Sequence, residues 1–193
     1  MLLDVIRHGA TATNSAGRFN TDAEHLLPSE LHRLRAVTSP LGDYDLIFVS
    51  PLRRCIETAE ALGLTRFETD ARLRERHFGI FAGLTPSECM ASFPMAFGAF
   101  ARFDAAFAPD GGESRAQHVA RIWAWLEDVC RRSPARALAI THGGTLDFLY
   151  RQATGRDLHG GSQIYAGDNA ALSSFRVEWP QIELIGFSQP LVP

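Results

Sequence analysis

Two segments of the sequence end in a histidine followed by a glycine, and each comes directly after an apolar run. Residues 7–9 read RHG after the run at 2–6, and residues 141–143 read THG after the run RALAI. Ligands of open parallel sheets bind beyond the carboxyl ends of the strands, where a glycine lets them approach the backbone. If both runs are strands of one sheet, His8 and His142 meet at that edge. The alternative is that each histidine is structural.

Two arginines belong to the same expected edge. Arg7 comes directly before His8, and Arg54 lies about one turn into the helix that should follow a strand at 45–49. A guanidinium group carries a permanent charge and a planar fork of donors that matches phosphate oxygens. The sequence therefore predicts a phosphate site made by two imidazoles and two guanidinium groups.

The elements that must position these residues alternate along the chain. Strands are predicted at 2–6, 45–49, 67–69 and 136–141, with closing strands at 171–177 and 182–187. Helices are predicted over 29–37 with Ser29 as N-cap, over 51–62 with Pro51 in the first turn, over 114–131 and over 145–153. This alternation favours an α/β three-layer sandwich, with a mostly parallel central sheet and helices on both faces.

Length and composition restrict the class of protein. The chain has 193 residues, 46% of them hydrophobic, which suits one domain over residues 1–193. All 19 basic residues are arginine, which excludes P-loop and Schiff-base enzymes because both need a lysine. The net charge of −3 and the scattered arginines argue against a nucleic-acid partner. Three cysteines without a CxxC pair, and apolar runs too short for a signal or membrane segment, predict a cytoplasmic protein with no membrane partner.

Residues 85–109 interrupt the alternation and are predicted to form a helical cap inserted in the domain. Phenylalanines recur there every three or four residues, at positions 93, 97, 100, 103 and 107. That spacing places them along one face of a helix or of a helical pair. Packing is the first interpretation of this stripe, and the alternative is that part of it faces an apolar piece of a substrate.

Five motifs along the chain resemble the histidine phosphatase superfamily, in its phosphoglycerate mutase-like branch. They are RHGATATN at 7–14, SPLRRCIETA at 50–59, LRERHFGIFAG at 73–83, PDGGES at 109–114 and THGGTL at 141–146. One such motif is weak evidence, but five in the family's order are specific and cover most of the chain. The segment RFNTDAEHLLPSELHRL at 18–34 departs from the family pattern, because it lacks a glycine and is shortened.

The resemblance implies a phosphohistidine mechanism that needs no metal and no cofactor. His8 would attack phosphorus and form the covalent intermediate. The oxygens of the transferred group would be held by Arg7, Arg54 and His142. Glu75 would act as general acid and then as general base. The further residues expected to bind the substrate, a small phosphomonoester, are Thr11, Asn14, Gly143, Arg76 and His77.

The two roles need opposite protonation states. Only a neutral histidine has a lone pair to attack with, and the nearby arginines should lower the pKa of His8. A phosphate dianion beside Glu75 should keep the proton on that carboxyl group. We therefore predict a bell-shaped pH profile or an optimum between acid and neutral pH.

Within the family, two activities remain open. The stretch ERHFG at 75–79 is close to the mutases' third motif, but only the 25 residues 84–108 separate Gly83 from Pro109, far fewer than the long insertion of similar mutases. A phosphatase is therefore favoured over cofactor-dependent phosphoglycerate mutase-type phosphoryl transfer. Length, the aromatic cap and PDGGES resemble the alpha-ribazole phosphatase subgroup, which implies alpha-ribazole 5′-phosphate as substrate and a role in cobalamin biosynthesis.

Three other classes of protein fit these residues less well. A non-catalytic phosphate-binding protein on the same fold is disfavoured by the intact set of reactive residues. A metallohydrolase would draw on His8, His142, His77 and Asp168, but HExxH and CxxC spacings are missing. The stretch CRRSPAR at 130–136 has cysteine-phosphatase spacing, but it has no glycine, and Pro134 has no N–H to bind phosphate. The oligomeric state stays open, with Trp179 and the tail SQPLVP as elements of a possible homodimer interface.

Overall fold

The computed structural model describes residues 1–37, 41–159 and 167–191, and these contain one six-stranded sheet. Its strands are β1 (Leu2–Arg7), β2 (Leu46–Val49), β3 (Glu68–Thr69), β4 (Arg136–Thr141), β5 (Ala171–Glu178) and β6 (Gln181–Pro190). Their order across the sheet is β3-β2-β4-β1-β5-β6. The first four run parallel, and β5 is antiparallel to both of its neighbours. The predicted mostly parallel sheet is confirmed.

Seven α-helices and two short 3₁₀ helices are found in the described part of the chain. The α-helices are α1 (Ala12–Ser15), α2 (Pro28–Arg35), α3 (Arg53–Ala61), α4 (Pro86–Ser92), α5 (Pro94–Ala101), α6 (Arg115–Arg131) and α7 (Gly143–Ala153). The 3₁₀ helices are η1 (Ala71–Leu73) and η2 (Gly79–Phe81). None of the helices within the described ranges is long and apolar enough to cross a lipid bilayer.

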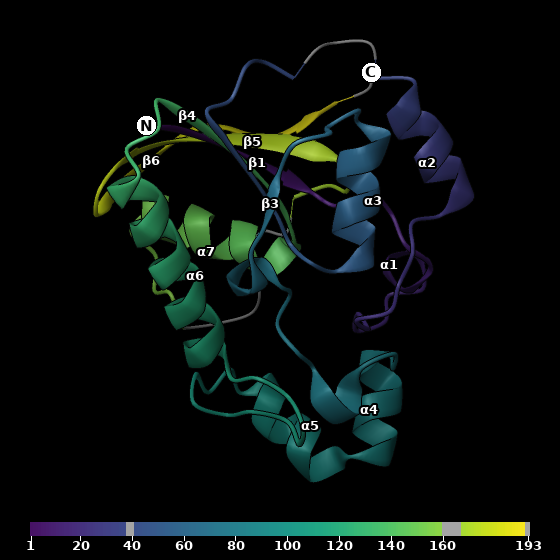
Figure 1. The fold of residues 1–193 in the computed structure, drawn as a ribbon. Coiled ribbons are helices and arrows are strands. Elements are labelled where there is room, and N and C mark those ends of the chain that lie inside the picture. Colours follow the sequence, from purple (N-terminus) through teal and green to yellow (C-terminus); the bar gives the residue numbers. More distant parts are fainter. Residues whose placement is uncertain (38–40, 160–166, 192–193) are drawn as a thin grey trace.

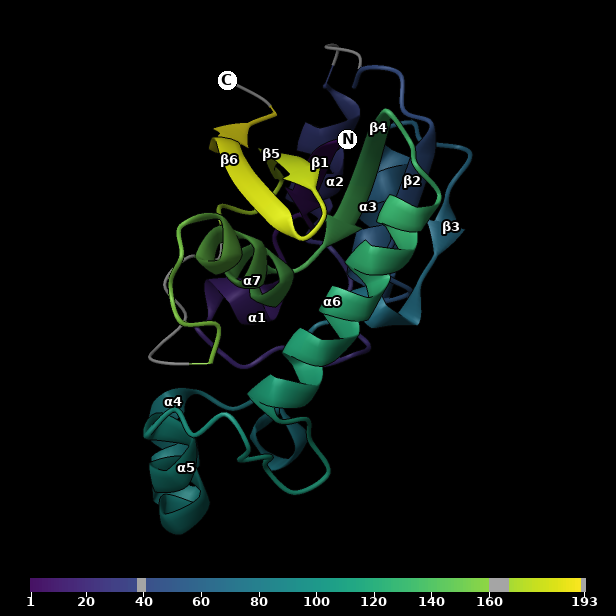
Figure 2. The ribbon, with the colours of Figure 1, turned by 90° about the vertical axis from the view of Figure 1, so that its left-hand side faces the viewer.

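Different helices cover the two faces of the sheet. Along β4, Ala137 and Ala139 belong to the apolar cluster shared with α6 and α7, whereas Leu138 and Ile140 belong to the cluster shared with α3. Successive side chains of a strand point to opposite faces, and a strand buried on both faces is a continuous apolar run. Figures 1 and 2 show the sheet between these two helical layers. The predicted three-layer sandwich is confirmed.

Helices α2, α3 and α7 begin at other residues than the sequence predicts, the last of them at Gly143 rather than at residue 145. The N-cap of α2 is Leu27 and Pro28 occupies its first turn, so Ser29 is not the cap. Proline suits that position because the first N–H groups of a helix have no intrahelical partner. Helix α3 begins only at Arg53, so Pro51 lies before the helix rather than in its first turn.

The segment 85–109 is helical only in its first two thirds. Helices α4 and α5 pack against each other, and an irregular stretch follows from residue 102 to residue 109. Figure 1 shows the pair below the sheet and its covering helices. Phe103 and Phe107 therefore lie beyond the helices, so the stripe of phenylalanines expected on one face of a helix or of a helical pair ends at Phe100.

Candidate active site

The order of the strands brings the two histidines together. Strands β1 and β4 are neighbours, and Arg7 is in register with Thr141. His8 and His142 are the residues that follow, and their ring centroids lie 5.1 Å apart at the same edge of the sheet. Both side chains are fully buried. The register of these two strands thus places the two imidazoles side by side.

The hydrogen bonds of His8 define which ring nitrogen is free. Its Nδ1 lies 2.7 Å from the carbonyl oxygen of Gly9. A carbonyl oxygen only accepts, so Nδ1 carries the hydrogen and the lone pair is on Nε2. That Nε2 is buried and has no partner among the described residues. Burial, followed by the charges of Arg54 and Arg7, holds the pKa of His8 well below 6.5, so the ring is neutral.

Among the described residues, the two arginines beside His8 have no carboxylate within ion-pair distance. Arg54 is fully buried, and its Nη1 donates to the carbonyl oxygen of Thr21 at 2.8 Å. Arg7 donates through Nη1 to the carbonyl oxygen of Gly167 at 2.6 Å. In the described part of the chain, neither group forms an ion pair, and both Nε atoms are buried without a partner. Because buried charges are normally paired, this arrangement suits an anion.

His142 is oriented by contacts with α3 and with the residue that follows β2. Its Nδ1 lies 3.3 Å from Nη2 of Arg54, which only donates, so the ring hydrogen is on Nε2. That Nε2 lies 2.8 Å from Oγ of Ser50, the residue that follows β2. Burial, followed by Arg54, lowers the pKa of His142 well below 6.5. Our sequence analysis assigned no role to Ser50, although its place at the end of the strand beside β4 was a usable signal.

Glu75 faces the beginning of α7. Its Oε1 accepts the backbone N–H of Arg76 at 2.9 Å, and its Oε2 accepts that of Gly144 at 3.4 Å. The partial positive charge of a helix N-terminus favours a carboxylate there. A Cβ on Gly144 would lie 2.5 Å from Glu75 Oε1 and from Cε1 of His118, so any other residue would force at least one of these side chains to move. The N–H of Gly144 thus faces the carboxylate of Glu75.

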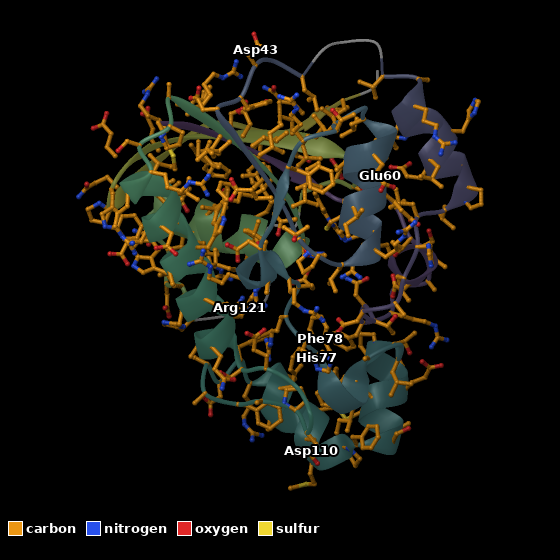
Figure 3. The ribbon with its side chains drawn as sticks, viewed as in Figure 1. Asp43, Glu60, His77, Phe78, Asp110 and Arg121 are labelled. Carbon is orange, nitrogen blue, oxygen red and sulfur yellow. The ribbon has the colours of Figure 1, made fainter. Side chains whose placement is uncertain are left out.

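Arg121 of α6 organises the segment that carries Glu75. It pairs with both carboxylate oxygens of Glu113, at 2.7 and 2.8 Å. It also donates to the backbone carbonyl oxygens of Arg72 and Glu75, at 2.5 and 3.1 Å. Figure 3 labels Arg121 on the part of α6 that faces this segment. Glu113 thus fixes the position of Arg121, and Arg121 is a positioning residue that the sequence analysis missed.

A cavity of about 500 Å³ lies over these residues. The term inner end is used here for two groups of residues. Four of them line the cavity: Arg7, Asn14, Glu75 and Gly143. The other three are fully buried and do not line the cavity: His8, Arg54 and His142. We call its outer wall the lining residues Arg76, Phe100, Phe103, Phe107, Arg115 and His118. A volume of this size is typical of small-molecule sites.

Two residues expected to bind the substrate are turned away from the cavity. Thr11 is buried and caps α1, and its hydroxyl donates to Oδ1 of Asn14 at 3.0 Å. The side chain of His77 is 50% exposed, and its Nε2 lies 4.0 Å from Asp22. Figure 3 shows His77 and Phe78 between the sheet layers and the cap helices. Of the expected binding residues, the cavity lining contains Asn14, Gly143 and Arg76.

The phenylalanines of the cap divide between the two roles that the sequence left open. Phe97 packs edge-on against Phe81, with ring centroids 5.5 Å apart. Phe100 also contacts Phe81, at 5.4 Å, but it lines the cavity together with Phe103 and Phe107. Packing therefore explains Phe97, and the later members of the stripe face the space where a ligand would bind.

The described ranges contain neither a metal site nor a cysteine-phosphatase loop. No three His, Cys, Asp or Glu side chains gather there in a way that would hold a metal ion. Cys130 is half-buried within α6, and Arg136 begins β4, so the two do not belong to one phosphate loop.

Trp179, which the sequence analysis named as an element of a homodimer interface, packs on Trp123 of its own chain, with ring centroids 4.7 Å apart.

Comparison with known proteins agrees with this geometry. The family model of the histidine phosphatase superfamily (branch 1) matches residues 3–188. The chain is 41% identical over 163 residues to a glucosyl-3-phosphoglycerate phosphatase of Mycobacterium tuberculosis (strain ATCC 25618 / H37Rv), covering 76% of this chain and 72% of that protein. It is 32% identical over 161 residues to a metal-independent phosphoserine phosphatase of Arabidopsis thaliana, covering 78% and 67%. The solved alpha-ribazole phosphatase from Shigella flexneri matches with a TM-score of 0.86 over 98% and 96% of the two chains, a likeness of fold at 19% identity.

Proposed function

The chain belongs to the histidine phosphatase superfamily and is a phosphatase, and on this premise we propose that it hydrolyses a small phosphomonoester through a phosphohistidine on His8. One observation carries the proposal. A neutral imidazole with its Nε2 lone pair free is buried between two guanidinium groups, Arg7 and Arg54, that have no carboxylate partner in the described structure. Such a pocket offers a nucleophile and a compensating anion site at the same place.

The proposed reaction has two displacements at phosphorus. In the first, Nε2 of His8 forms a bond to phosphorus while the bond from phosphorus to the ester oxygen breaks, and Glu75 gives its proton to that oxygen. In the second, water attacks phosphorus, Glu75 takes a proton from the water, and the nitrogen–phosphorus bond breaks. Arg7, Arg54 and His142 stabilise the charge that spreads over the phosphoryl oxygens. Free phosphate and an alcohol are released, and the enzyme returns to its starting state.

The burial of His8 adds one requirement to this scheme. A phosphoryl group reaches Nε2 only if a side chain at the inner end moves, because Nε2 is enclosed. Arg7 lines the cavity and holds the carbonyl oxygen of Gly167 through Nη1. We infer that Arg7 exchanges this carbonyl for a phosphate oxygen when the substrate enters, since a charge-assisted bond to phosphate is stronger.

The remaining expected residues have different parts in the proposal. Asn14, Gly143 and Arg76 line the cavity and are the ones proposed to touch the substrate. Thr11 acts through Asn14, whose Oδ1 it holds. His77 contacts the backbone N–H of Gly79 through Nδ1 at 3.3 Å, and we propose no direct substrate contact for it.

The names of the relatives support several substrates for this site. The two curated relatives described above act on glucosyl-3-phosphoglycerate and on phosphoserine by their names, and the second is named metal-independent. The cavity wall formed by Phe100, Phe103 and Phe107 favours a second candidate, alpha-ribazole 5′-phosphate, whose flat ring would pack on phenyl groups. That substrate would connect the protein to cobalamin biosynthesis. All three cysteines are free thiols, which supports a reducing compartment such as the cytoplasm.

A panel of phosphomonoesters tests the proposal. Phosphate release is measured with glucosyl-3-phosphoglycerate, phosphoserine, 3-phosphoglycerate and alpha-ribazole 5′-phosphate, each with and without EDTA. We expect hydrolysis of at least one ester at a rate that EDTA leaves unchanged. Loss of activity in EDTA would revive a metal-dependent reaction. Interconversion of phosphoglycerates without phosphate release would favour a mutase, and binding without turnover of any ester would indicate a non-catalytic protein.

A further inference from the structure

A short segment late in the chain lies against the first residues of the first motif. We call residues 167–170, which directly precede β5, the clasp segment. The carbonyl oxygen of Gly167 accepts Nη1 of Arg7 at 2.6 Å. The backbone N–H of Ala170 lies 3.0 Å from the carbonyl oxygen of Arg7 and 3.3 Å from that of His8. The backbone around the proposed nucleophile is thus held by a segment from the other end of the chain.

Asn169 is the residue of the clasp segment whose side chain lies closest to the chemistry. It lines the cavity, and its Nδ2 lies 2.8 Å from the carbonyl oxygen of His8 and 3.4 Å from that of Gly9. Carbonyl oxygens only accept, so the NH2 end of the amide faces them. The carbonyl oxygen of Gly9 is also the acceptor for Nδ1 of His8, at 2.7 Å. One amide therefore contacts the oxygen that fixes the tautomer of the imidazole.

The same amide also orients Asn14. Nδ2 of Asn169 lies 3.3 Å from Oδ1 of Asn14, and the hydroxyl of Thr11 donates to that oxygen at 3.0 Å. Two donors at Oδ1 fix which end of the Asn14 amide is the acceptor. Its NH2 group donates to Oδ1 of Asn20 at 3.1 Å and carries a second hydrogen, which is what a phosphate oxygen would need. Asn169 thus contacts both the nucleophile and a residue proposed to bind the substrate.

The backbone of the clasp segment is strained where it makes these contacts. Ala170 has a φ of 53°, in the left-handed region that residues with a side chain rarely adopt. Such strain persists where the surrounding structure determines the backbone, and it occurs most often at functional sites. Ala170 is also the residue whose N–H reaches the carbonyl oxygens of Arg7 and His8. The strained residue and the amide of Asn169 therefore hold the same stretch of backbone.

We propose that Asn169 is a positioning residue for the reaction, whose NH2 group holds the carbonyl oxygens of His8 and Gly9 so that the imidazole keeps its hydrogen on Nδ1. This role rests on the proposed function of His8 as the nucleophile. Without the donor, the carbonyl group of Gly9 is free to turn away from the ring. A neutral imidazole is then free to carry its hydrogen on Nε2, where it blocks the attacking lone pair.

Two substitutions of Asn169 separate its donor from its volume. Asn169→Leu keeps the approximate size and removes the donor, and kcat for p-nitrophenyl phosphate should fall by about 10- to 100-fold at every pH, the scale of a misplaced reacting group. Asn169→Asp keeps the shape, but its carboxyl group donates only while it carries a proton. The three acceptor oxygens around it disfavour the charged form, so its pKa should exceed the usual value of about 4 despite the nearby Arg7. The ratio of its kcat to that of the wild type should therefore rise as the pH falls from about 8 to about 4.5.

The direction of this change distinguishes the proposal from two simpler explanations. A carboxylate near His8 would by its charge alone raise the pKa of the imidazole, so the ratio would fall toward acid pH. A role in packing alone would give a ratio that does not depend on pH, because Asp and Asn have the same shape. Either result would overturn the proposal, and the Asp variant decides it even if Asn169→Leu does not fold.

Ser188→Ala is the control for a general loosening of the clasp segment. The hydroxyl of Ser188 holds Asp168 from β6, since it accepts the backbone N–H of Asp168 at 2.8 Å and donates to Oδ2 at 3.0 Å. This substitution removes an anchor of the same segment and leaves the amide of Asn169 in place. We expect Ser188→Ala to keep the kcat and the pH profile of the wild type.

A ¹⁵N NMR measurement of the resting enzyme separates failure of this role from failure of the reaction, because it requires no turnover. We expect His8 to carry its hydrogen on Nδ1 in the wild type and to show a mixture of both tautomers in Asn169→Leu. An unchanged tautomer in a folded Asn169→Leu enzyme would overturn the positioning role and leave the phosphatase function standing. A phosphoenzyme labelled at a residue other than His8 would overturn the proposed reaction, and the NMR spectrum would still decide whether Asn169 fixes the ring.

Discussion

The inner end and the outer wall of the cavity both carry guanidinium groups, but they are built from different elements. At the inner end, His8 and His142 follow two hydrogen-bonded strands and are fully buried. At the outer wall, Phe100 belongs to a short helix, and Phe103 lies beyond it and is 42% exposed. We therefore propose that the sheet determines the chemistry at phosphorus, whereas the cap and the start of α6 determine which alcohol is accepted.

Substitutions should separate the two regions. A change at the inner end should lower kcat for every phosphomonoester, because the phosphoryl group is common to all of them. A change in the outer wall should alter the ratio of kcat/KM between esters, because it affects contacts with the alcohol alone. The variants below are ordered from the largest expected effect to the smallest.

His8→Ala removes the proposed nucleophile. We expect kcat to fall by about 10⁴-fold or more with any ester, including p-nitrophenyl phosphate, because no other group replaces the attacking lone pair. Steady-state phosphate release measures the loss. His25→Ala is the control, since the side chain of His25 is 68% exposed and contacts Glu57, away from the cavity. A His8→Ala enzyme that is folded by circular dichroism and retains a tenth of the activity would contradict the role of His8.

Arg54→Gln removes one charge beside His8 and His142. The loss of one preorganised donor to the phosphoryl group should lower kcat by about 10²- to 10³-fold. The pH profile should also move. Activity falls as the pH drops through the pKa of His8, because the ring must be neutral to attack, and Arg54 holds that pKa down. Without Arg54 this pKa rises, and the acid limb of kcat/KM should shift to higher pH.

The neighbouring residue offers a matched control for this shift. Arg53 is 53% exposed and pairs with Glu57, and it does not line the cavity. Arg53→Gln should therefore leave both kcat and the acid limb where they are in the wild type. An acid limb that stays fixed in Arg54→Gln would show that another group titrates there.

Gly144→Ala tests the position of Glu75, where the inner end meets the outer wall. The added methyl group would lie 2.5 Å from Glu75 Oε1 and from Cε1 of His118, so at least one of them must move. We expect kcat to fall by about 10- to 100-fold, because a general acid contributes on that scale and the shift is partial. Gly98→Ala in α5 is the control: its methyl group would meet nothing within 4 Å, and activity should be unchanged.

Phe100→Leu should give the smallest effect, confined to the outer wall. It removes the ring that faces Arg76 at 5.0 Å. We expect KM for the preferred ester to rise by about three- to tenfold with little change in kcat, since a single cation–π contact is weak. Initial rates over a range of substrate concentrations separate the two constants. A large fall in kcat would show that the outer wall takes part in the chemistry and would remove the distinction drawn above.

The inner end was predictable from the sequence because the ends of buried strands can be recognised there. An apolar run followed by His-Gly occurs twice, and neighbouring parallel strands bring their carboxyl ends to one edge. Thr11 and His77 show that a place in a motif does not determine what a side chain contacts. Thr11 belongs to the first motif, yet its side chain caps a four-residue helix, a local choice that the motif does not reveal.

The outer wall was less predictable because it depends on packing between distant elements. The spacing of the phenylalanines fits a helix as far as Phe107, but α5 ends at Ala101, where the irregular stretch begins. Arg115 and His118 are one turn apart in the sequence, but their place in the cavity depends on how α6 crosses the start of α7. Nothing in the pattern of α6 alone distinguishes these two residues from other polar positions of the helix.

The measurement closest to the central claim is capture of the phosphoenzyme. Enzyme in excess is mixed with a ³²P-labelled ester, quenched within one turnover in alkaline detergent, and mapped by peptide mass spectrometry. The account predicts a phosphoryl group that is stable to base and labile to acid, located on His8 and absent from His8→Ala. Full phosphate release with no labelled protein at any quench time, or label on a residue other than His8, would contradict it.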